Sequence, residues 1–539
     1  MYGSITLENR FGVNKMELIS LKYAIFVIVL LVLYYCFPKK YRWYVLLAGS
    51  MAYYVIICKW YVLFIIFTIC TTYGSTIWID KLLKKQNAIV KSHKEDWDRQ
   101  TRKEYKEKGR KKRVAVMLFA LLCNFGILAF LKYIPYAGEL GLLLPLGISF
   151  YTFQSMGYVM DVYREIVEPE KNFLKVALFV SFFPQIIQGP IAIYDKLAGQ
   201  LYEGHSLRLE NLQKGALLVL WGVMKKLVIA DRAVNIINFV MDKPMDFSGT
   251  YVFFAAVVYA LQLYADFSGG IDIVRGIAEM FGITMSTNFN HPYFSRSLTE
   301  YWHRWHMTLG DWCRNYIFYP LSISKRFLNF GKWLKPRFGA HISKVLPGCI
   351  ASVITFIVIG VWHGANMKYL YFGLWNGIVI MLAELFAPVN KKVAGGFFKL
   401  TGLREKGIFA TIVSVLWTFM LILVGYYFDI AANASTAFHM LFKSVTDFHI
   451  SELGINNIIL NLGACGLDEY DILLLIICTL LWFFISFVEE KKKLDMRYFI
   501  LSRKLPLRWA IIYLGIFIVI IFGYYGPGVN PADFVYMQF

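Results

Sequence analysis

The sequence predicts an all-α, polytopic integral membrane protein with roughly 11–12 transmembrane helices plus short re-entrant or amphipathic helices. Two observations predict this class. Of the 539 residues, 58% are hydrophobic and only 17% are charged, whereas soluble domains carry about 25% charged residues. The apolar residues are also gathered into long runs without Asp, Glu, Lys or Arg. A helix needs about 20 apolar residues to cross roughly 30 Å of hydrocarbon.

Six uncharged runs reach or approach that length: Trp60–Ile79, Val114–Leu131, Val345–Trp362, Gly407–Phe428, Ile472–Val488 and Trp509–Asn530. Five shorter runs are further candidates: Tyr23–Phe37, Tyr44–Cys58, Ala177–Ile193, Thr250–Ala265 and Tyr369–Ala383. Flanking lysines extend the usable length of several runs, because their stems lie along apolar surface while the ammonium reaches the interface. We expect the first run to be retained rather than cleaved, since it ends in the stop-transfer pattern Phe37-Pro38-Lys39-Lys40.

Positive charge is concentrated in the loops between these runs. Four loops are rich in Lys and Arg, and a fifth is a candidate: Pro38–Trp43, Asp80–Arg113, Lys325–Lys344, Lys391–Lys406 and Glu489–Arg508. The positive-inside rule places such loops in the cytoplasm. We therefore expect a multi-pass protein of the cell membrane with both termini extracytoplasmic. This placement accounts for the net charge of +20, so the expected partner is the lipid bilayer and no nucleic acid.

The largest basic loop, residues 80–113, carries fourteen Lys/Arg against six Asp/Glu and has a helical composition without a core-forming stripe. One interpretation is a solvated cytoplasmic helical hairpin or loop. The alternative is a docking face for an acidic carrier protein or for anionic lipid head groups.

The chain divides into four predicted regions. Residues 1–144 hold N-terminal transmembrane helices with the basic loop, and residues 145–388 form a core. Residues 389–525 hold C-terminal transmembrane helices, and residues 526–539 form an extracytoplasmic tail with an aromatic motif. The core is irregular, since Gly and Pro residues and polar side chains interrupt its apolar stretches. The polar residues are Gln154, Asp161, Arg164, Gln185, Gln188, Gln262, Asp266, Asp272 and Arg275. Polar groups at membrane depth usually face a cavity or one another, so we expect function here.

Three histidines in the core are candidate acid–base groups. His303 and His306 lie in E-Y-W-H-R-W-H, and His363 ends an uncharged run in G-V-W-H-G. A His near the end of a span is also commonly an interfacial hydrogen-bonding residue. Imidazole is the side chain suited to proton transfer near neutral pH. His303 and His306 would share a face of one helix and could ligate zinc, but no third ligand stands at a usual spacing, so no metal is expected.

Five ordered stretches resemble the membrane-bound O-acyltransferase (MBOAT) family, in its bacterial alginate O-acetyltransferase-like and teichoic acid D-alanyltransferase-like branch. They are PLGISFYTFQSMGYVMDVYR, SFFPQIIQGPI, YADFSGGIDIVRG, NFNHPYFSRSLTEYWHRWHMTLGDWCRNYIFYPL and GVWHGA, spread over residues 145–365. The resemblance implies a catalytic core over residues 145–388 with helices around a central funnel. It also implies that the family's invariant His is His363 and its second active-site position is His306.

Acyl transfer also follows from the chemistry of these residues. A thioester donor needs a base to deprotonate the incoming hydroxyl, and His363 is the best candidate. His306 is expected to orient the acceptor or to stabilise the oxyanion. Trp302, Trp305 and Trp362 would line the substrate path and exclude water. Arg304 is a candidate for the phosphate of a pantetheine arm, although an arginine at a span end is commonly an interface anchor.

The tail ends in Phe534-Val535-Tyr536-Met537-Gln538-Phe539, which resembles an F-x-Y-x-Q-F motif found in this branch. In that branch the tyrosine is thought to be acylated, so Tyr536 is a candidate acyl-carrying residue. An interfacial aromatic anchor is the alternative.

The predicted function is a membrane-embedded O-acyltransferase. It would move a short acyl group, most simply acetyl, from a cytoplasmic thioester (acyl-CoA or an acyl-carrier protein) across the membrane to an extracellular polysaccharide of the envelope. No permanently bound cofactor is expected, and a separate extracytoplasmic SGNH-type transferase is a candidate partner. The alternatives are D-alanyl transfer to a teichoic-acid-like polymer, acylation of a lipid or protein, and a transporter without covalent chemistry.

Overall fold

The computed structural model describes residues 16–401, 404, 407–454, 457, 465–526 and 534. These residues form helices joined by turns and loops, with no β-strand among them. The predicted all-α class is therefore confirmed. The chain divides into two compact units, Met1–Val219 with Ile271–Ser286 and Leu220–Gly270 with Thr287–Phe539.

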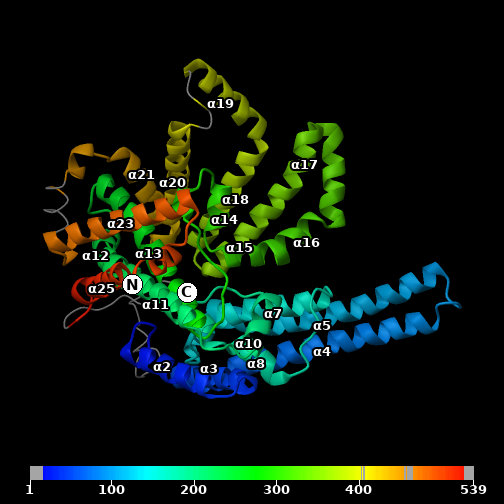
Figure 1. The fold of residues 1–539 in the computed structure, drawn as a ribbon. Coiled ribbons are helices and arrows are strands. Elements are labelled where there is room, and N and C mark those ends of the chain that lie inside the picture. The colour runs from blue at the N-terminus through cyan, green and yellow to red at the C-terminus, as the bar shows by residue number, and fades with distance from the viewer. Residues whose placement is uncertain are drawn as a thin grey trace. The chain divides into compact units, whose positions relative to one another are not determined.

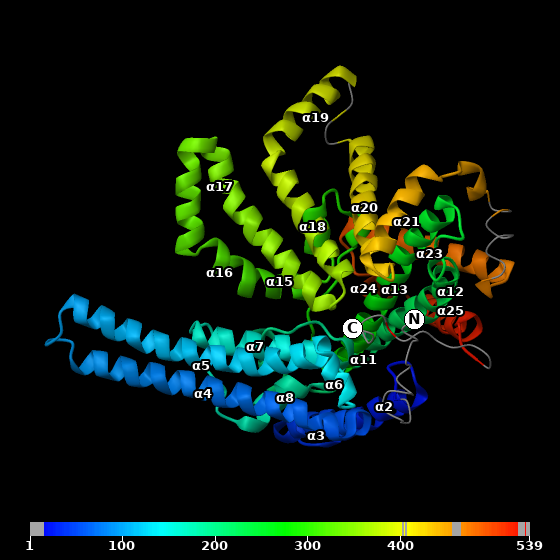
Figure 2. The same cartoon turned by 180° about the vertical axis from the view of Figure 1, so that it is seen from behind.

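The first unit contains a long helical hairpin, visible from both sides in Figures 1 and 2. Its arms are α4 (Val62–Ser92) and α5 (Arg99–Tyr133), which pack against each other. Asp98 caps α5 by accepting a hydrogen bond from the Thr101 amide at 2.9 Å. The two helices cover residues 80–113 except for a turn at 93–98, so the predicted helical hairpin in this basic segment is confirmed.

The remaining helices of the first unit are shorter: α2 (Leu21–Cys36), η1 (Lys39–Tyr41), α3 (Arg42–Cys58), η2 (Lys59–Tyr61), α6 (Pro135–Glu139), α7 (Ile148–Tyr163), α8 (Phe173–Ser181), α9 (Phe183–Gln188), α10 (Tyr194–Tyr202) and most of α11 (Leu209–Met224). Buried polar groups in this unit bond to one another, as predicted for the irregular core. The Gln185 amide donates to Gln154 Oε1 at 2.6 Å and to the Pro190 carbonyl at 3.0 Å. Gln154 in turn donates to the Phe179 carbonyl at 2.6 Å.

The second unit holds the longer apolar helices. Its elements are η3 (a π-helix, Lys225–Ala230), α12 (Asp231–Met241), the larger part of α13 (Gly249–Met280), η4 (Pro292–Phe294), α14 (Leu298–Arg304), α15 (Met307–Cys313), η5 (a π-helix, Arg314–Phe318), α16 (Tyr319–Ser322), α17 (Lys325–His363), α18 (Met367–Leu385), α19 (Ala387–Thr401), α20 (Ile408–Ile430), α21 (Ala434–Thr446), η6 (Ile450–Leu453), α23 (Glu469–Lys492), α24 (Met496–Leu501) and α25 (Leu505–Phe522).

Among the described helices, seven are long and apolar enough to cross a membrane, or up to eight if the bent pair α18–α19 forms one span. The number is below the expected 11–12 for two reasons. One continuous helical stretch, Lys39–Ser92, contains both predicted runs Tyr44–Cys58 and Trp60–Ile79. In addition, Leu21–Cys36 and Phe173–Gln188 are apolar but shorter than a full span.

The basic segment Lys325–Lys344, predicted as a loop, is helical. It forms the first part of α17, which is bent at Gly339, where φ is +81°. A positive φ is readily adopted by glycine and costly for other residues. The apolar second part of α17 then carries the chain to His363.

Candidate active site

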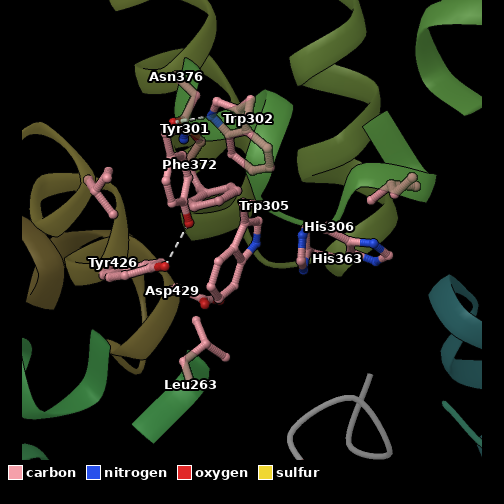
Figure 3. A pocket seen from close by; sticks show the side chains of 12 residues that line it. Leu263, Tyr301, Trp302, Trp305, His306, His363, Phe372, Asn376, Tyr426 and Asp429 are labelled. Carbon is pink, nitrogen blue, oxygen red and sulfur yellow. Dashed lines mark hydrogen bonds between the residues drawn. The ribbon is translucent and has the colours of Figure 1, made fainter. Parts of the chain in front are cut away.

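A pocket inside the second unit brings His306 and His363 together (Figure 3). It is lined by residues from α13, α14, α15, α17, α18 and α20: Leu263, Tyr301, Trp302, Trp305, His306, Leu309, His363, Phe372, Asn376, Ile422, Tyr426 and Asp429. Of the site residues predicted from sequence, His306, His363, Trp302 and Trp305 all lie here. Most of the remaining lining is aromatic or aliphatic, which is typical of a site that holds a small ligand and little water.

His363 is the last residue of α17, and close helix packing fixes its position. A side chain at Gly360 would meet the Tyr369 carbonyl, and one at Gly373 of α18 would meet the Phe356 carbonyl. These glycines let the backbones of α17 and α18 approach closely, as small residues do between membrane helices. The imidazole of His363 lies between aromatic rings of α18, stacked on Tyr369 at 5.9 Å and edge-on to Phe372 at 5.5 Å.

His306 lies at a break between two short helices. It is the N-cap of α15 and has a left-handed backbone, with φ +44° and ψ +50°. Such a conformation is uncommon outside glycine and often marks a functional position. His303 belongs to the preceding helix, α14, so the expectation that His303 and His306 share one helix face is wrong. Within the described part of the chain, no three His, Cys, Asp or Glu side chains cluster as metal ligands would.

Asn288 fixes the tautomer of His306. The Asn288 Oδ1 atom accepts hydrogen bonds from the Thr308 amide at 3.1 Å and from the Thr308 hydroxyl at 2.8 Å. The amide N–H can only donate, so the Asn288 atom on this side is the oxygen. His306 Nδ1 lies 3.2 Å from the same oxygen and must therefore carry a proton. In the neutral ring the lone pair then resides on Nε2.

Burial keeps His306 neutral. The side chain is 1% exposed, and its pKa is lowered from 6.5 to about 3, chiefly by burial and further by the nearby His363. Burial lowers the pKa of a histidine because the charged form loses its hydration. At any physiological pH the ring is therefore an imidazole that donates through Nδ1 and accepts through Nε2.

The two tyrosines of the lining, Tyr301 and Tyr426, belong to one chain of hydrogen bonds that continues to Tyr293 outside the lining. Tyr293 donates to the Ala260 carbonyl at 2.6 Å. Since each hydroxyl has one proton, the 3.1 Å contact between Tyr293 and Tyr426 must be a bond donated by Tyr426. By the same reasoning Tyr301 donates to Tyr426 at 2.8 Å. Trp302 is held in a similar way, since its Nε1 donates to Asn376 Oδ1 at 3.0 Å.

Two of the predicted site residues that the structure describes, Trp362 and Arg304, are not in the lining. Trp362 is buried and packs edge-on to His306, with ring centroids 6.3 Å apart, so it contacts the imidazole without lining the pocket. Arg304 pairs with Glu300 at 2.7 Å and Glu490 at 3.1 Å, so its charge is already balanced by carboxylates. Tyr536 lies outside the described residues.

Two features of the site were not predicted from sequence. Asn288 begins one of the stretches that carry the family resemblance, but nothing in the sequence alone distinguishes it from its neighbours. Asp429 is the acidic residue that lines the pocket, and its Oδ2 accepts a hydrogen bond from Tyr259 at 2.7 Å. Lys368 lies beside it and donates to the backbone carbonyls of Asp429 and Ala431. The signal for Asp429 was present, because it is the first charged residue after the uncharged run Gly407–Phe428.

The hydrogen bond from His306 to Asn288 gives a testable positioning role. Asn288→Ala is expected to lower the turnover rate of acyl transfer by about tenfold to a hundredfold, because a misplaced reacting group costs that much. Asn288→Asp should retain more activity, since a carboxylate oxygen still accepts the bond from His306 and the two bonds from Thr308. Ester formation in isolated membranes measures both variants. A wild-type rate for Asn288→Ala would contradict the role.

Part of the chain that contains His306 matches a known protein family. Residues 169–335 match the model of MBOAT, the membrane-bound O-acyltransferase family. The match includes His306 and ends before His363. A probable alginate O-acetylase of Pseudomonas syringae pv. tomato is 30% identical over 315 residues, which cover 58% of this chain and 54% of that protein.

Two further relatives carry different names. A peptidoglycan O-acetyltransferase of Helicobacter pylori is 30% identical over 314 residues, covering 51% of this chain and 56% of that protein. A teichoic acid D-alanyltransferase of Bacillus subtilis is 26% identical over 288 residues, covering 52% and 67%. The chain thus spans little more than half the length of the first two relatives. The resemblance found in the sequence is confirmed: residues 169–335 match the MBOAT, membrane-bound O-acyltransferase, family.

Proposed function

We propose that the protein is a membrane-embedded O-acyltransferase that moves a short acyl group, acetyl in the simplest case, from a cytoplasmic thioester to a hydroxyl acceptor outside. The observation that carries the proposal is the joint presence of His306 and His363 in one aromatic pocket of the second unit. The similarity to O-acetyltransferases of alginate and peptidoglycan supports an envelope polysaccharide as the final acceptor.

In the proposed step, His363 takes the proton of the acceptor hydroxyl. The hydroxyl oxygen then attacks the carbonyl carbon of the thioester, and the tetrahedral intermediate expels the thiolate. The C–S bond breaks, the C–O bond remains, and the thiolate takes the proton from His363. The products are an ester and a free thiol, so neither a net proton nor a redox partner is needed. General base catalysis of this kind contributes about 10²–10⁴-fold to a rate.

The neutral tautomer of His306 favours one of its two expected roles. Stabilising an oxyanion through Nε2 would require a proton on that nitrogen, and a pKa of about 3 opposes protonation. Accepting a hydrogen bond through Nε2 requires none. Since the reacting hydroxyl gives its one proton to His363, a bond to His306 Nε2 must come from another O–H or N–H donor of the acceptor. We therefore assign His363 to proton transfer, and His306 to orienting the acceptor through such a neighbouring donor.

The aromatic lining supports transfer over hydrolysis. Trp302 and Trp305 line the pocket, and Trp305 is 4% exposed. A site that excludes water protects a reactive thioester from hydrolysis. Trp362 does not line the pocket, and we assign it to packing against the His306 ring.

The tail is proposed as a relay for the acyl group. Thiol, phenol and sugar hydroxyl have increasing pKa values, from about 8.5 for the thiol to about 10 for the phenol. Each transfer would therefore run downhill, from thioester to Tyr536 and from Tyr536 to the polysaccharide, directly or through an SGNH-type transferase. The donor is proposed to be acyl-CoA or an acyl-carrier protein, with no permanently bound cofactor.

Tyr536→Phe tests the relay. The variant is expected to lose the acyl group from the tail, because it removes the accepting oxygen and little else. Mass spectrometry of the C-terminal peptide after incubation with the thioester measures it. Tyr525→Phe is a matched control, since Tyr525 is an exposed tyrosine in the same part of the chain. If the Tyr536→Phe variant still acylates the polysaccharide at the wild-type rate, the relay is contradicted and the tail is an interfacial anchor.

D-alanyl transfer is a second candidate, and one observation favours it. The carboxylate of Asp429 lines the pocket, where it would pair with the ammonium group of a D-alanyl ester. The two candidates separate when ester-linked acetyl and D-alanyl groups are measured on envelope polymers from cells with and without the protein. Loss of one group identifies the reaction. Unchanged amounts of both would contradict the proposal and leave acylation of a lipid or protein, or a transporter without covalent chemistry.

A further inference from the structure

A buried ion cluster lies in the second unit, outside the pocket. Lys226 Nζ is 2.8 Å from Asp231 Oδ1 and 2.7 Å from Asp266 Oδ1. The neighbouring Lys225 donates to Ser268 at 2.8 Å. All four charged side chains are at most 3% exposed. Two cations and two anions balance, so the cluster has no excess charge with which to recruit an anionic ligand.

The cluster is built on an unusual backbone. Lys225 and Lys226 begin the π-helix η3, which runs to Ala230, and Asp231 follows it directly. π-Helical turns are rare and occur frequently at functional sites. Buried charges are costly to keep even when paired, which makes a purely stabilising role a weak explanation for the cluster.

The C-terminal segment is attached to this same π-helix. The Tyr524 amide donates to the Leu227 carbonyl at 2.9 Å. Arg232 donates to the Phe522 carbonyl at 2.8 Å, and its guanidinium lies over the Tyr524 ring at 5.6 Å. The end of α25 is thereby fixed on η3 and the start of α12.

Phe534 of the tail returns to the cluster. Its ring lies 4.5 Å from Lys226 Nζ, and the side chain is only 5% exposed. An ammonium over an aromatic face is attracted by the ring quadrupole, most strongly where water is excluded. Within the charge-balanced cluster, the Lys226 ammonium is thus the group that attracts the aromatic ring.

The cluster also borders the candidate active site. Asp266, which binds Lys226, immediately precedes Phe267 on α13. The Phe267 ring packs edge-on to the His306 ring, with centroids 4.9 Å apart. Phe534 is therefore linked to His306 through Lys226, Asp266 and Phe267, all within the second unit.

We propose that the ion cluster of Lys225, Lys226, Asp231 and Asp266 is a docking site for the chain's own C-terminal tail, with Phe534 as the positioning residue that seats it on Lys226 by cation–π contact. This inference rests on the proposed role of the tail as acyl carrier. Seating on a cluster that is linked to His306 through Asp266 and Phe267 would raise the local concentration of the accepting tyrosine near the active site. Phe534 itself touches no reacting atom.

Two readouts on one set of variants test the docking. The variants are Phe534→Ala, Phe534→Leu and Phe534→Tyr, with Phe517→Ala as control, because Phe517 is an exposed phenylalanine of α25. The first readout is carboxypeptidase trimming of the full-length protein in lipid nanodiscs, followed by intact mass. The second is acylation of the C-terminal peptide after incubation with acetyl thioester.

Trimming past residue 534 should be about tenfold faster in Phe534→Ala and Phe534→Leu than in wild type, since both lose the cation–π contact. Phe534→Tyr keeps an aromatic face and should stay near wild type, as should Phe517→Ala. Tail acylation should fall in parallel. Rescue by tyrosine but not by leucine separates seating on the ammonium from general apolar packing.

The two proposals fail in distinguishable ways. Equal trimming rates for wild type and Phe534→Ala would overturn the docking, whatever Tyr536 does. Protection that depends on Phe534, combined with full polysaccharide acylation by Tyr536→Phe, would leave the docking standing and overturn the carrier role. Loss of protection without any loss of tail acylation would show that the seat does not serve transfer, and would overturn the positioning role.

Discussion

Replacing His363 with alanine is expected to lower acetylation of the cell-surface polysaccharide by about 10²–10⁴-fold, the usual contribution of a general base. His306 also lines the pocket, but burial lowers the pKa of His306 to about 3, which makes it a weak base at neutral pH. Ester-linked acetyl released from washed cells measures the effect.

His303→Ala is the matched control for His363→Ala. His303 is an exposed histidine of α14 and is not among the pocket residues. It should leave acetylation within about twofold of wild type, as expected for a surface substitution. Protein amounts in the membrane are compared by an epitope tag. Undiminished acetylation in His363→Ala at normal protein levels would exclude His363 as the base.

Replacing Lys226 with methionine is expected to destabilise the protein by about 3–5 kcal/mol, because two buried carboxylates lose their shared cation. Asp231 and Asp266 are 2% and 0% exposed, so water cannot replace the ammonium. The effect is measured as a fall in the midpoint of thermal unfolding of the detergent-purified protein. Size-exclusion chromatography after heating detects the protein that remains folded.

Lys84→Met is the control for the Lys226 experiment. Lys84 pairs with Asp80 at 2.6 Å, but its side chain is 64% exposed. Exposed pairs contribute only about 0–1 kcal/mol. The double variant Lys226→Met with Asp266→Asn should recover part of the stability, since it restores the charge balance. If Lys226→Met were no less stable than Lys84→Met, the buried carboxylates of Asp231 and Asp266 would not depend on Lys226 for charge compensation.

The long apolar spans could be predicted from the sequence because membrane helices are selected mainly by length and absence of charge. The uncharged run Gly407–Phe428 corresponds to α20, which spans Ile408–Ile430. Ile472–Val488 lies within α23, which spans Glu469–Lys492. The helix over Lys325–Lys344 was not predicted, because this segment is rich in charge. Charge indicates the limit of the hydrocarbon layer and not the end of a helix.

The pocket was only partly predictable. His306, His363, Trp302 and Trp305 stood out by chemistry and by resemblance. The break at His306 could not be foreseen, because its left-handed backbone depends on tertiary contacts and not on local propensity. Arg304 was proposed for a phosphate, but its partner Glu490 is 186 residues away along the chain.

Distant partners explain the other omissions. Tyr301 and Tyr426 are 125 residues apart in sequence and meet by hydrogen bond in the pocket wall. Asp429 meets Tyr259 across 170 residues. A single sequence contains the hydrophobic pattern of each helix but not which polar positions on different helices will face each other.

Acyl transfer by purified protein in lipid nanodiscs tests the central claim most directly. Acetyl-CoA and an acetyl-loaded carrier protein are supplied as donors, a polysaccharide fragment as acceptor, and free thiol and new ester are measured together. We predict equal amounts of thiol and ester with wild type, and background levels with the double variant His306→Ala/His363→Ala. Ester formation by the double variant at the wild-type rate, or none by wild type with either donor, would contradict the claim that this histidine pocket transfers an acyl group.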